Sequence, residues 1–69
     1  MTLLDIKKKM AIKVLRIADD SNRVNLIRLG VCEGDIITAE KILMGPILVN
    51  DTICVGRNLA KRIEVEWIP

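Results

Sequence analysis

The clearest indication of a β fold comes from residues 47–67, which read ILVNDTICVGRNLAKRIEVEW. Ile or Val recurs at every second position in three short runs of this stretch, and in the last run these residues and Trp67 alternate with Glu, as is typical of half-buried strands. The three runs cover residues 47–49, 53–55 and 63–67. Asn50-Asp51 favours a hairpin between the first two runs. Before the last run, residues 58–61 predict one helical turn, with Asn58 as its N-cap.

Two upstream segments have the same strand pattern. In a segment that runs from residue 37 to about residue 42, Ile37 and Ala39 alternate with Thr38 and Glu40. The run 10–17 also alternates, but its apolar positions slip by one residue, which predicts a β-bulge near Leu15 and Arg16. Five short strands favour a small barrel, because closing a sheet removes its exposed edges.

A short helix is expected at residues 23–29, after the first strand. Ser21 or Asn22 is its expected N-cap, and Gly30 has the position of a left-handed residue that ends a helix. A helix this short is unstable alone, so we expect its wide apolar stripe to pack against the barrel. The stripe consists of Val24, Leu26, Ile27 and Leu29.

Length and composition limit the function classes. The 69 residues allow one domain, 1–69, and a hydrophobic fraction of 51% excludes disorder. Trp67 is the only aromatic residue, so a platform for stacking bases is nearly ruled out. The chain has no His, which removes the commonest general base and metal ligand. We therefore expect a protein that is not an enzyme.

Charge and cysteine content indicate the compartment and the class of partner. A net charge of +2 is too balanced to predict nucleic-acid binding. Cys32 and Cys54 form no C-x-x-C pair, which is typical of reduced cytosolic thiols, and Cys54 is expected to be a small core residue. No apolar run approaches the ~20 residues that cross a bilayer. The sequence thus predicts a cytoplasmic protein.

Several motifs, taken in order, resemble a known family. They are Leu3-Leu4-x-Ile6-Lys7, Val14-x-x-Ile17, Leu26-x-x-Leu29-Gly30-Val31-x-x-Gly34, Gly45-Pro46-Ile47 and Ile53-Cys54-Val55-Gly56-Arg57-x-x-Ala60-x-x-Ile63-x-Val65. This set resembles the FeoA family, which comprises small cytosolic proteins of bacterial ferrous-iron uptake, and the related C-terminal domain of iron-dependent repressors. Glu33 departs from the family pattern, which usually has Pro there, and the tail Trp67-Ile68-Pro69 has no counterpart in it.

The resemblance implies an SH3-like five-stranded barrel with one short helix after the first strand and a helical turn before the last. It also implies a non-enzymatic accessory or regulatory protein that binds the cytosolic side of a FeoB-type GTPase transporter. Membrane association would then occur only through that partner, without nucleic acid and without a resident cofactor. Most of the shared motif is expected to be core or turn, with positive φ at Gly30, Gly34 and Gly56.

Three groups of residues are candidates for partner binding. The basic run around Lys7 could dock an acidic protein surface or anionic lipid headgroups, although charge runs on small domains mostly serve solubility. Apolar side chains at the tip of the loop after residue 42 favour contact with another protein. The helix offers a third, basic surface. The candidates are Lys7, Lys8 and Lys9, then Leu43, Met44, Gly45 and Pro46, and finally Arg23 and Arg28.

A metal role is the first alternative. Cys32, Glu33 and Asp35 place one soft and two hard ligands within four residues, and Fe²⁺ accepts such mixed donors. Neighbouring loop residues rarely form a preformed site, so any Fe²⁺ binding is expected to be weak. A second alternative, an RNA-associated barrel, predicts binding that weakens steeply with salt.

Overall fold

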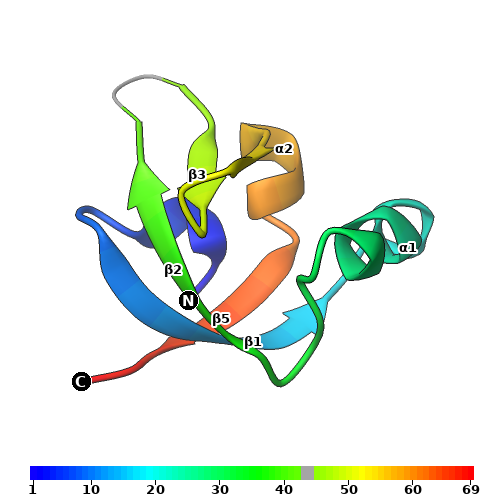
Figure 1. Cartoon of the computed structure of the whole chain (residues 1–69), viewed down its shortest axis with the longest axis horizontal. Helices are drawn as coiled ribbons and strands as arrows, with labels where there is room; N and C mark the ends of the chain where they lie inside the picture. Colours follow the sequence, from blue (N-terminus) through cyan, green and yellow to red (C-terminus); the bar gives the residue numbers. More distant parts are fainter. Residues whose placement is uncertain (43–44) are drawn as a thin grey trace.

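The computed structural model describes residues 1–42 and 45–69 and contains a five-stranded antiparallel sheet with two helices (Figure 1). The strands are β1 (Met10–Ile17), β2 (Ile36–Lys41), β3 (Ile47–Val49), β4 (Ile53–Val55) and β5 (Ile63–Trp67). A 3-10 helix (Leu3–Asp5) precedes β1, helix α1 (Asp20–Arg28) follows it, and helix α2 (Arg57–Ala60) leads into β5. The strand order β4-β3-β2-β1-β5 confirms the predicted, mainly β fold. The sheet is compatible with an SH3-like barrel, although its described strands do not close into a ring.

The predicted bulge in β1 is confirmed. The register of β1 against β5 shifts between Val14 and Arg16. As a result Leu15 and Arg16 both face outward, while Val14 and Ile17 both point into the core. β1 lies between β2 and β5, and its residues Ile12 and Lys13 pair with both neighbouring strands.

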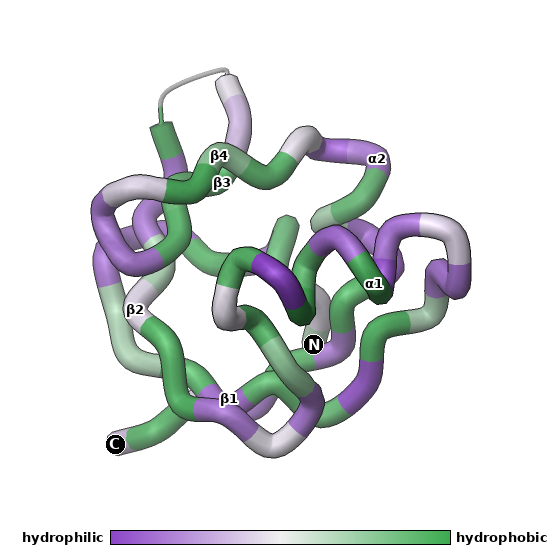
Figure 2. The backbone as a smooth tube through the Cα atoms, turned by 45° about the vertical axis from the view of Figure 1, so that its right-hand side comes forward, coloured by the Kyte–Doolittle hydropathy of each residue, from purple (hydrophilic) through white to green (hydrophobic). Residues whose placement is uncertain are grey.

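The core is built from aliphatic side chains. Ile12, Ile47 and Ile63 are completely buried, and each lies on the inward face of its strand. Figure 2 shows green, hydrophobic segments along the strands, such as those at β3 and β4. Burying one such side chain contributes roughly 1.5–3 kcal/mol, so aliphatic packing is the main source of stability.

The hairpin predicted at Asn50-Asp51 is also confirmed. Both residues have positive φ, 51° and 63°, which Asn and Asp tolerate better than most residues. The Thr52 N–H donates to the Val49 carbonyl oxygen at 3.2 Å and closes the turn. The Asn50 side chain accepts a hydrogen bond from the Thr38 N–H at 3.1 Å, which ties the hairpin to β2.

Helix α1 differs from its prediction at its start. It begins at Asp20, and its N-cap is Asp19 rather than Ser21 or Asn22. Its end is as predicted, because Gly30 has a φ of 92°. The Gly30 N–H donates to the Ile27 oxygen at 3.0 Å and the Val31 N–H donates to the Leu26 oxygen at 2.8 Å. These two bonds form a Schellman motif, which ends the helix.

The packing predicted for the apolar stripe of α1 is largely wrong. Leu26 is buried, but the exposed fractions of Val24, Ile27 and Leu29 are 54%, 49% and 56%. Figure 1 shows the reason, since α1 projects to one side of the sheet rather than lying across it. The C-terminal end of the helix therefore reaches the core through Leu26 and through Val31, which lies just after the glycine that ends the helix.

Three further predictions on local structure are wrong: the positive φ at Gly56, the cap at Asn58 and the burial of Cys54. Gly56 has a φ of −61° and serves as the N-cap of α2, so Asn58 is an interior residue of that helix and not its cap. Cys54 is exposed, because alternation in β4 turns its neighbours Ile53 and Val55 inward. Within residues 1–42 and 45–69, no helix is long and apolar enough to cross a membrane.

Candidate functional site

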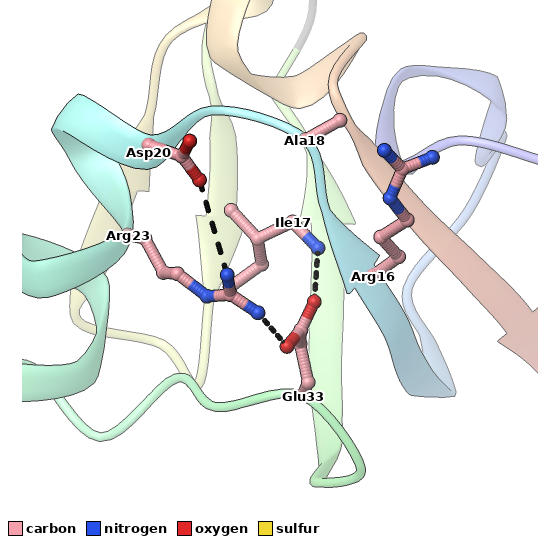
Figure 3. A pocket seen from close by; sticks show the side chains of 6 residues that line it. All are labelled: Arg16, Ile17, Ala18, Asp20, Arg23 and Glu33. Carbon is pink, nitrogen blue, oxygen red and sulfur yellow. Dashed lines mark hydrogen bonds and ion pairs between the residues drawn. The ribbon is translucent and has the colours of Figure 1, made fainter.

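A polar pocket lies where β1 meets α1 and the loop after it (Figure 3). One Glu33 oxygen accepts a hydrogen bond from the Ile17 N–H at 3.0 Å, and the other accepts from the Arg23 guanidinium. Arg23 also lies 3.9 Å from the Asp20 carboxylate. The structure therefore brings together Arg23, a partner candidate, and Glu33, a metal candidate, as an ion pair.

This ion pair helps to connect the loop after α1 to β1. The Ile17 N–H and the Arg23 guanidinium hold the pKa of the Glu33 carboxyl below its usual value, because both stabilise the charged form. Glu33 thus fastens the loop that follows α1 to the end of β1, next to the bulge. The Gly34 N–H, which donates to the Val14 oxygen at 2.6 Å, strengthens the same connection.

The other two metal candidates lie in the same loop. The Asp35 carboxylate accepts a hydrogen bond from the Cys32 N–H at 3.1 Å, and the Asp35 N–H donates to the Cys32 oxygen at 3.1 Å. Cys32 itself is partly buried. Among the residues that the structure describes, no three Cys, Asp or Glu side chains gather as a metal-binding cluster. The carboxylates of Glu33 and Asp35 instead bind backbone N–H groups.

A second polar network centres on Asp19, which the sequence did not single out. Its carboxylate accepts hydrogen bonds from the Ser21 hydroxyl at 2.8 Å and the Asn22 side-chain amide at 2.9 Å. Arg62, from the turn before β5, lies 3.2 Å away. The Asn22 and Ser21 hydrogen bonds, with a smaller contribution from Arg62, lower the Asp19 pKa to about 2. Asp19 thereby connects α1 to the β5 end of the barrel.

The outward side of α1 forms an apolar surface beside a basic residue. Val24, Ile27 and Arg28 share one side of the helix, because they are three and four residues apart. Within the described part of the chain Arg28 forms no ion pair, whereas Arg23 does. We call Val24, Ile27 and Arg28 the α1 face. The two arginine candidates therefore differ, and Arg28 alone is available to a partner.

The three consecutive lysines also differ in their contacts. Lys9 forms an ion pair with Asp51 at 2.8 Å. Lys7 and Lys8 instead border a hollow of about 640 Å³ at one end of the barrel. Its lining consists of Met1, Asp5, Ile6, Lys7, Lys8, Met10 and Trp67.

The loop candidates are described only in part. Leu43 and Met44 lie outside the described residues. Gly45 and Pro46 are partly buried and belong to the connection between β2 and β3. The Gly45 N–H donates to the Ile42 oxygen at 2.9 Å, and the Pro46 oxygen accepts from the Ile42 N–H at 3.3 Å. Both residues therefore help to shape this turn.

The fold and these surfaces define a small β module with an apolar helix face beside its sheet. The family model described as FeoA domain matches residues 1–66. The chain therefore belongs to the FeoA family, which connects it with ferrous-iron transport. No curated protein and no solved structure matches the chain.

Proposed function

We propose that this chain is a cytoplasmic accessory protein of ferrous-iron uptake that binds the cytosolic side of a FeoB-type GTPase transporter. It acts by binding and not by catalysis. Membership of the FeoA family supports the transport role. The observation that carries the binding role is the α1 face.

The α1 face has the properties of a helical binding surface. Leu26 anchors the helix in the core, while Val24 and Ile27 remain about half exposed on the opposite side. A groove on the partner that covers these two side chains would remove apolar surface from water at about 25 cal/mol per Å². Anchors spaced three residues apart are typical of a helix that binds in a groove. Arg28 at the border adds a residue type that is enriched in interfaces.

Regulation follows if the two states of the transporter bind this face differently. A protein shifts a conformational equilibrium only by its difference in affinity for the two conformations. A tenfold preference for one state of the GTPase is worth about 1.4 kcal/mol. The accessory protein thus needs no reactive group to change the activity of the transporter.

An amide NMR titration of the labelled full chain with the cytosolic GTPase domain of the matching transporter tests this proposal. We expect chemical-shift changes to cluster on residues 23–29. The variant Ile27→Ser is expected to weaken binding about tenfold or more, as loss of an apolar anchor does. Ile36→Ser is the matched control, because Ile36 is 64% exposed on β2 and lies outside the α1 face. Equal weakening by both variants, or shifts that avoid α1, would contradict the proposal.

The alternative of a metal-sensing domain has no comparable support. The carboxylates of Glu33 and Asp35 already accept backbone hydrogen bonds, so a metal ion would have to displace them. Titration of Fe²⁺ under anaerobic conditions into the chain and into Cys32→Ser distinguishes the two functions. The accessory role predicts the same weak response from both proteins.

A further inference from the structure

The hollow at the end of the barrel combines exposed apolar side chains with two lysines. Met1 and Trp67 are 53% and 58% exposed, and Lys7 and Lys8 border the same hollow. We propose that this surface contacts the headgroup region of an anionic membrane directly. This inference goes beyond the proposed function, in which the protein reaches the membrane only through its partner.

Trp67 is exposed although it lies on the inward face of a well-anchored strand. Trp67 pairs with Ile12, which places it on the same face of the strand as the buried Ile63 and Val65. β5 extends to the rim of the barrel, however, so the indole ring lies over the hollow instead of in the core. The Ile68 N–H donates to the Ala11 oxygen at 3.2 Å and holds this end of the strand in place.

The charges around the hollow favour anionic headgroups. Within residues 1–42 and 45–69, neither Lys7 nor Lys8 forms an ion pair. The acidic residue of the lining, Asp5, accepts hydrogen bonds from the Thr2 N–H at 2.8 Å and the Thr2 hydroxyl at 3.2 Å. Its carboxylate therefore serves the turn at Leu3–Asp5 and leaves both ammonium groups unpaired. Each lysine near an anionic surface strengthens binding by about fivefold.

The composition of the hollow fits a lipid surface better than an extended peptide. Its wall is almost entirely apolar. An extended peptide needs hydrogen-bond partners for its main chain. The lipid boundary between headgroups and acyl chains can cover an apolar surface without such partners. Trp prefers that boundary, and the alkyl part of a lysine lies along apolar surface while its ammonium remains in water. Trp67, Met1, Lys7 and Lys8 provide this combination on one side of the molecule.

This surface is separate from the α1 face. Figure 1 shows the C-terminal end and the loop before β1 on the left, whereas α1 lies on the right. A membrane and a protein partner could therefore occupy the two surfaces together. Membrane contact would hold the protein near a transporter and leave α1 accessible.

Vesicle binding by the full chain tests the inference. Vesicles of phosphatidylcholine alone are compared with vesicles that contain about 30 mol% phosphatidylglycerol, since anionic lipid supplies the electrostatic attraction. We expect co-sedimentation with the anionic vesicles and a blue shift of the tryptophan emission on binding. Trp67 is the only aromatic residue, so this emission reports on the hollow alone.

Charge variants distinguish binding through this surface from nonspecific electrostatic attraction between the protein and anionic vesicles. The double variant Lys7→Gln/Lys8→Gln is expected to lower vesicle binding about 30-fold. The matched control Arg57→Gln/Lys61→Gln removes the same charge from the region of α2 and should keep most of the binding. Trp67→Ala should also weaken binding, and its circular dichroism spectrum verifies that the variant is folded.

Four results would overturn the inference. The first three are no binding to anionic vesicles, equal losses in the two double variants, and binding without a change in tryptophan emission. The fourth is that Lys7→Gln/Lys8→Gln weakens binding to the GTPase domain while no vesicles bind, since the surface would then serve an acidic protein. The first three outcomes leave the NMR test of the α1 face unchanged, so the two proposals can fail independently.

Discussion

Asp19 shows how much one side chain contributes when it lies between two elements. Its carboxylate caps α1 through Asn22 and also meets Arg62, which lies 43 residues further along the chain. The sequence indicated a cap in this turn, but Asp, Ser and Asn are about equally good N-caps. The local sequence does not distinguish Asp19 from Ser21 and Asn22, whereas the structure shows that Asp19 is the cap and also meets Arg62.

Removal of the Asp19 carboxylate is expected to destabilise the protein. Asp19→Ala leaves the first turn of α1 without its acceptor and should lower the melting temperature by about 5 °C. Asp19→Asn keeps one acceptor oxygen for the first turn but replaces the oxygen that accepts from the Asn22 side chain and faces Arg62, so its loss should be smaller than that of Asp19→Ala. Thermal unfolding followed by circular dichroism measures both variants. Equal losses would show that the charge, rather than the cap, is what matters.

Acid should weaken the connection of α1 to the barrel. The Asp19 pKa falls from the usual 3.8 to about 2 in the folded protein, and the Glu33 pKa is also lowered. The folded state therefore binds protons less readily than the unfolded chain. The stabilisation is complete above pH 3.8 and is lost as the pH falls through 2. Urea unfolding between pH 5 and pH 2 checks this expectation.

The Asp19→Asn variant provides the control for this acid dependence, because it lacks the carboxylate with the lowered pKa. Its urea midpoint should depend less on pH over the same range. If the urea midpoint of Asp19→Asn falls with pH as steeply as that of the parent, other carboxylates cause the acid sensitivity.

At the level of elements, the C-terminal end of α1 was easier to predict than its start or its packing. Gly30 indicates the end of the helix in the sequence, because glycine adopts the left-handed conformation most easily. The periodicity also showed an apolar stripe, but it carries no information on the angle at which the helix meets the sheet. That angle leaves Val24 and Ile27 in solvent. The candidates Leu43 and Met44 remain predictions.

Two glycines test the account of the helix ends. Gly30→Ala should reduce the free energy of unfolding by about 1–2 kcal/mol, since its φ of 92° strains any residue with a Cβ. Gly56→Ala is the control, because its φ of −61° suits alanine and its added Cβ meets no atom within 4 Å. We expect that variant to stay within about 0.5 kcal/mol of the parent. Chemical denaturation gives both values, and a similar loss in the two variants would refute the assignment.

At the level of the whole molecule, stability rests on a small aliphatic core. A 69-residue domain is expected to have a free energy of unfolding of roughly 3–10 kcal/mol. The alternating pattern identified the main core positions of the strands, since Ile47, Val49, Val55, Ile63 and Val65 are all buried. The pattern missed the exposure of Cys54, because inward and outward positions look alike when both are apolar.

Truncation in this core should come close to unfolding the protein. Ile12 is completely buried on β1, and Ile12→Ala is expected to remove about 2–5 kcal/mol. Ile36→Ala, on the exposed face of β2, should change the free energy by less than about 1 kcal/mol. Urea denaturation of both variants tests this contrast. A large loss at Ile36 would mean that this face is covered.

The position of β1 in the sheet has a consequence for synthesis of the protein. β1 is made early, but its longest register is with β5, some fifty residues later in the chain. Contacts this distant in sequence form slowly, because a long loop must close first. On the ribosome, β2, β3 and β4 can pair with their neighbours as they emerge, while one edge of β1 waits for residues 63–67. The nascent chain therefore carries an open strand edge until that last strand has left the exit tunnel.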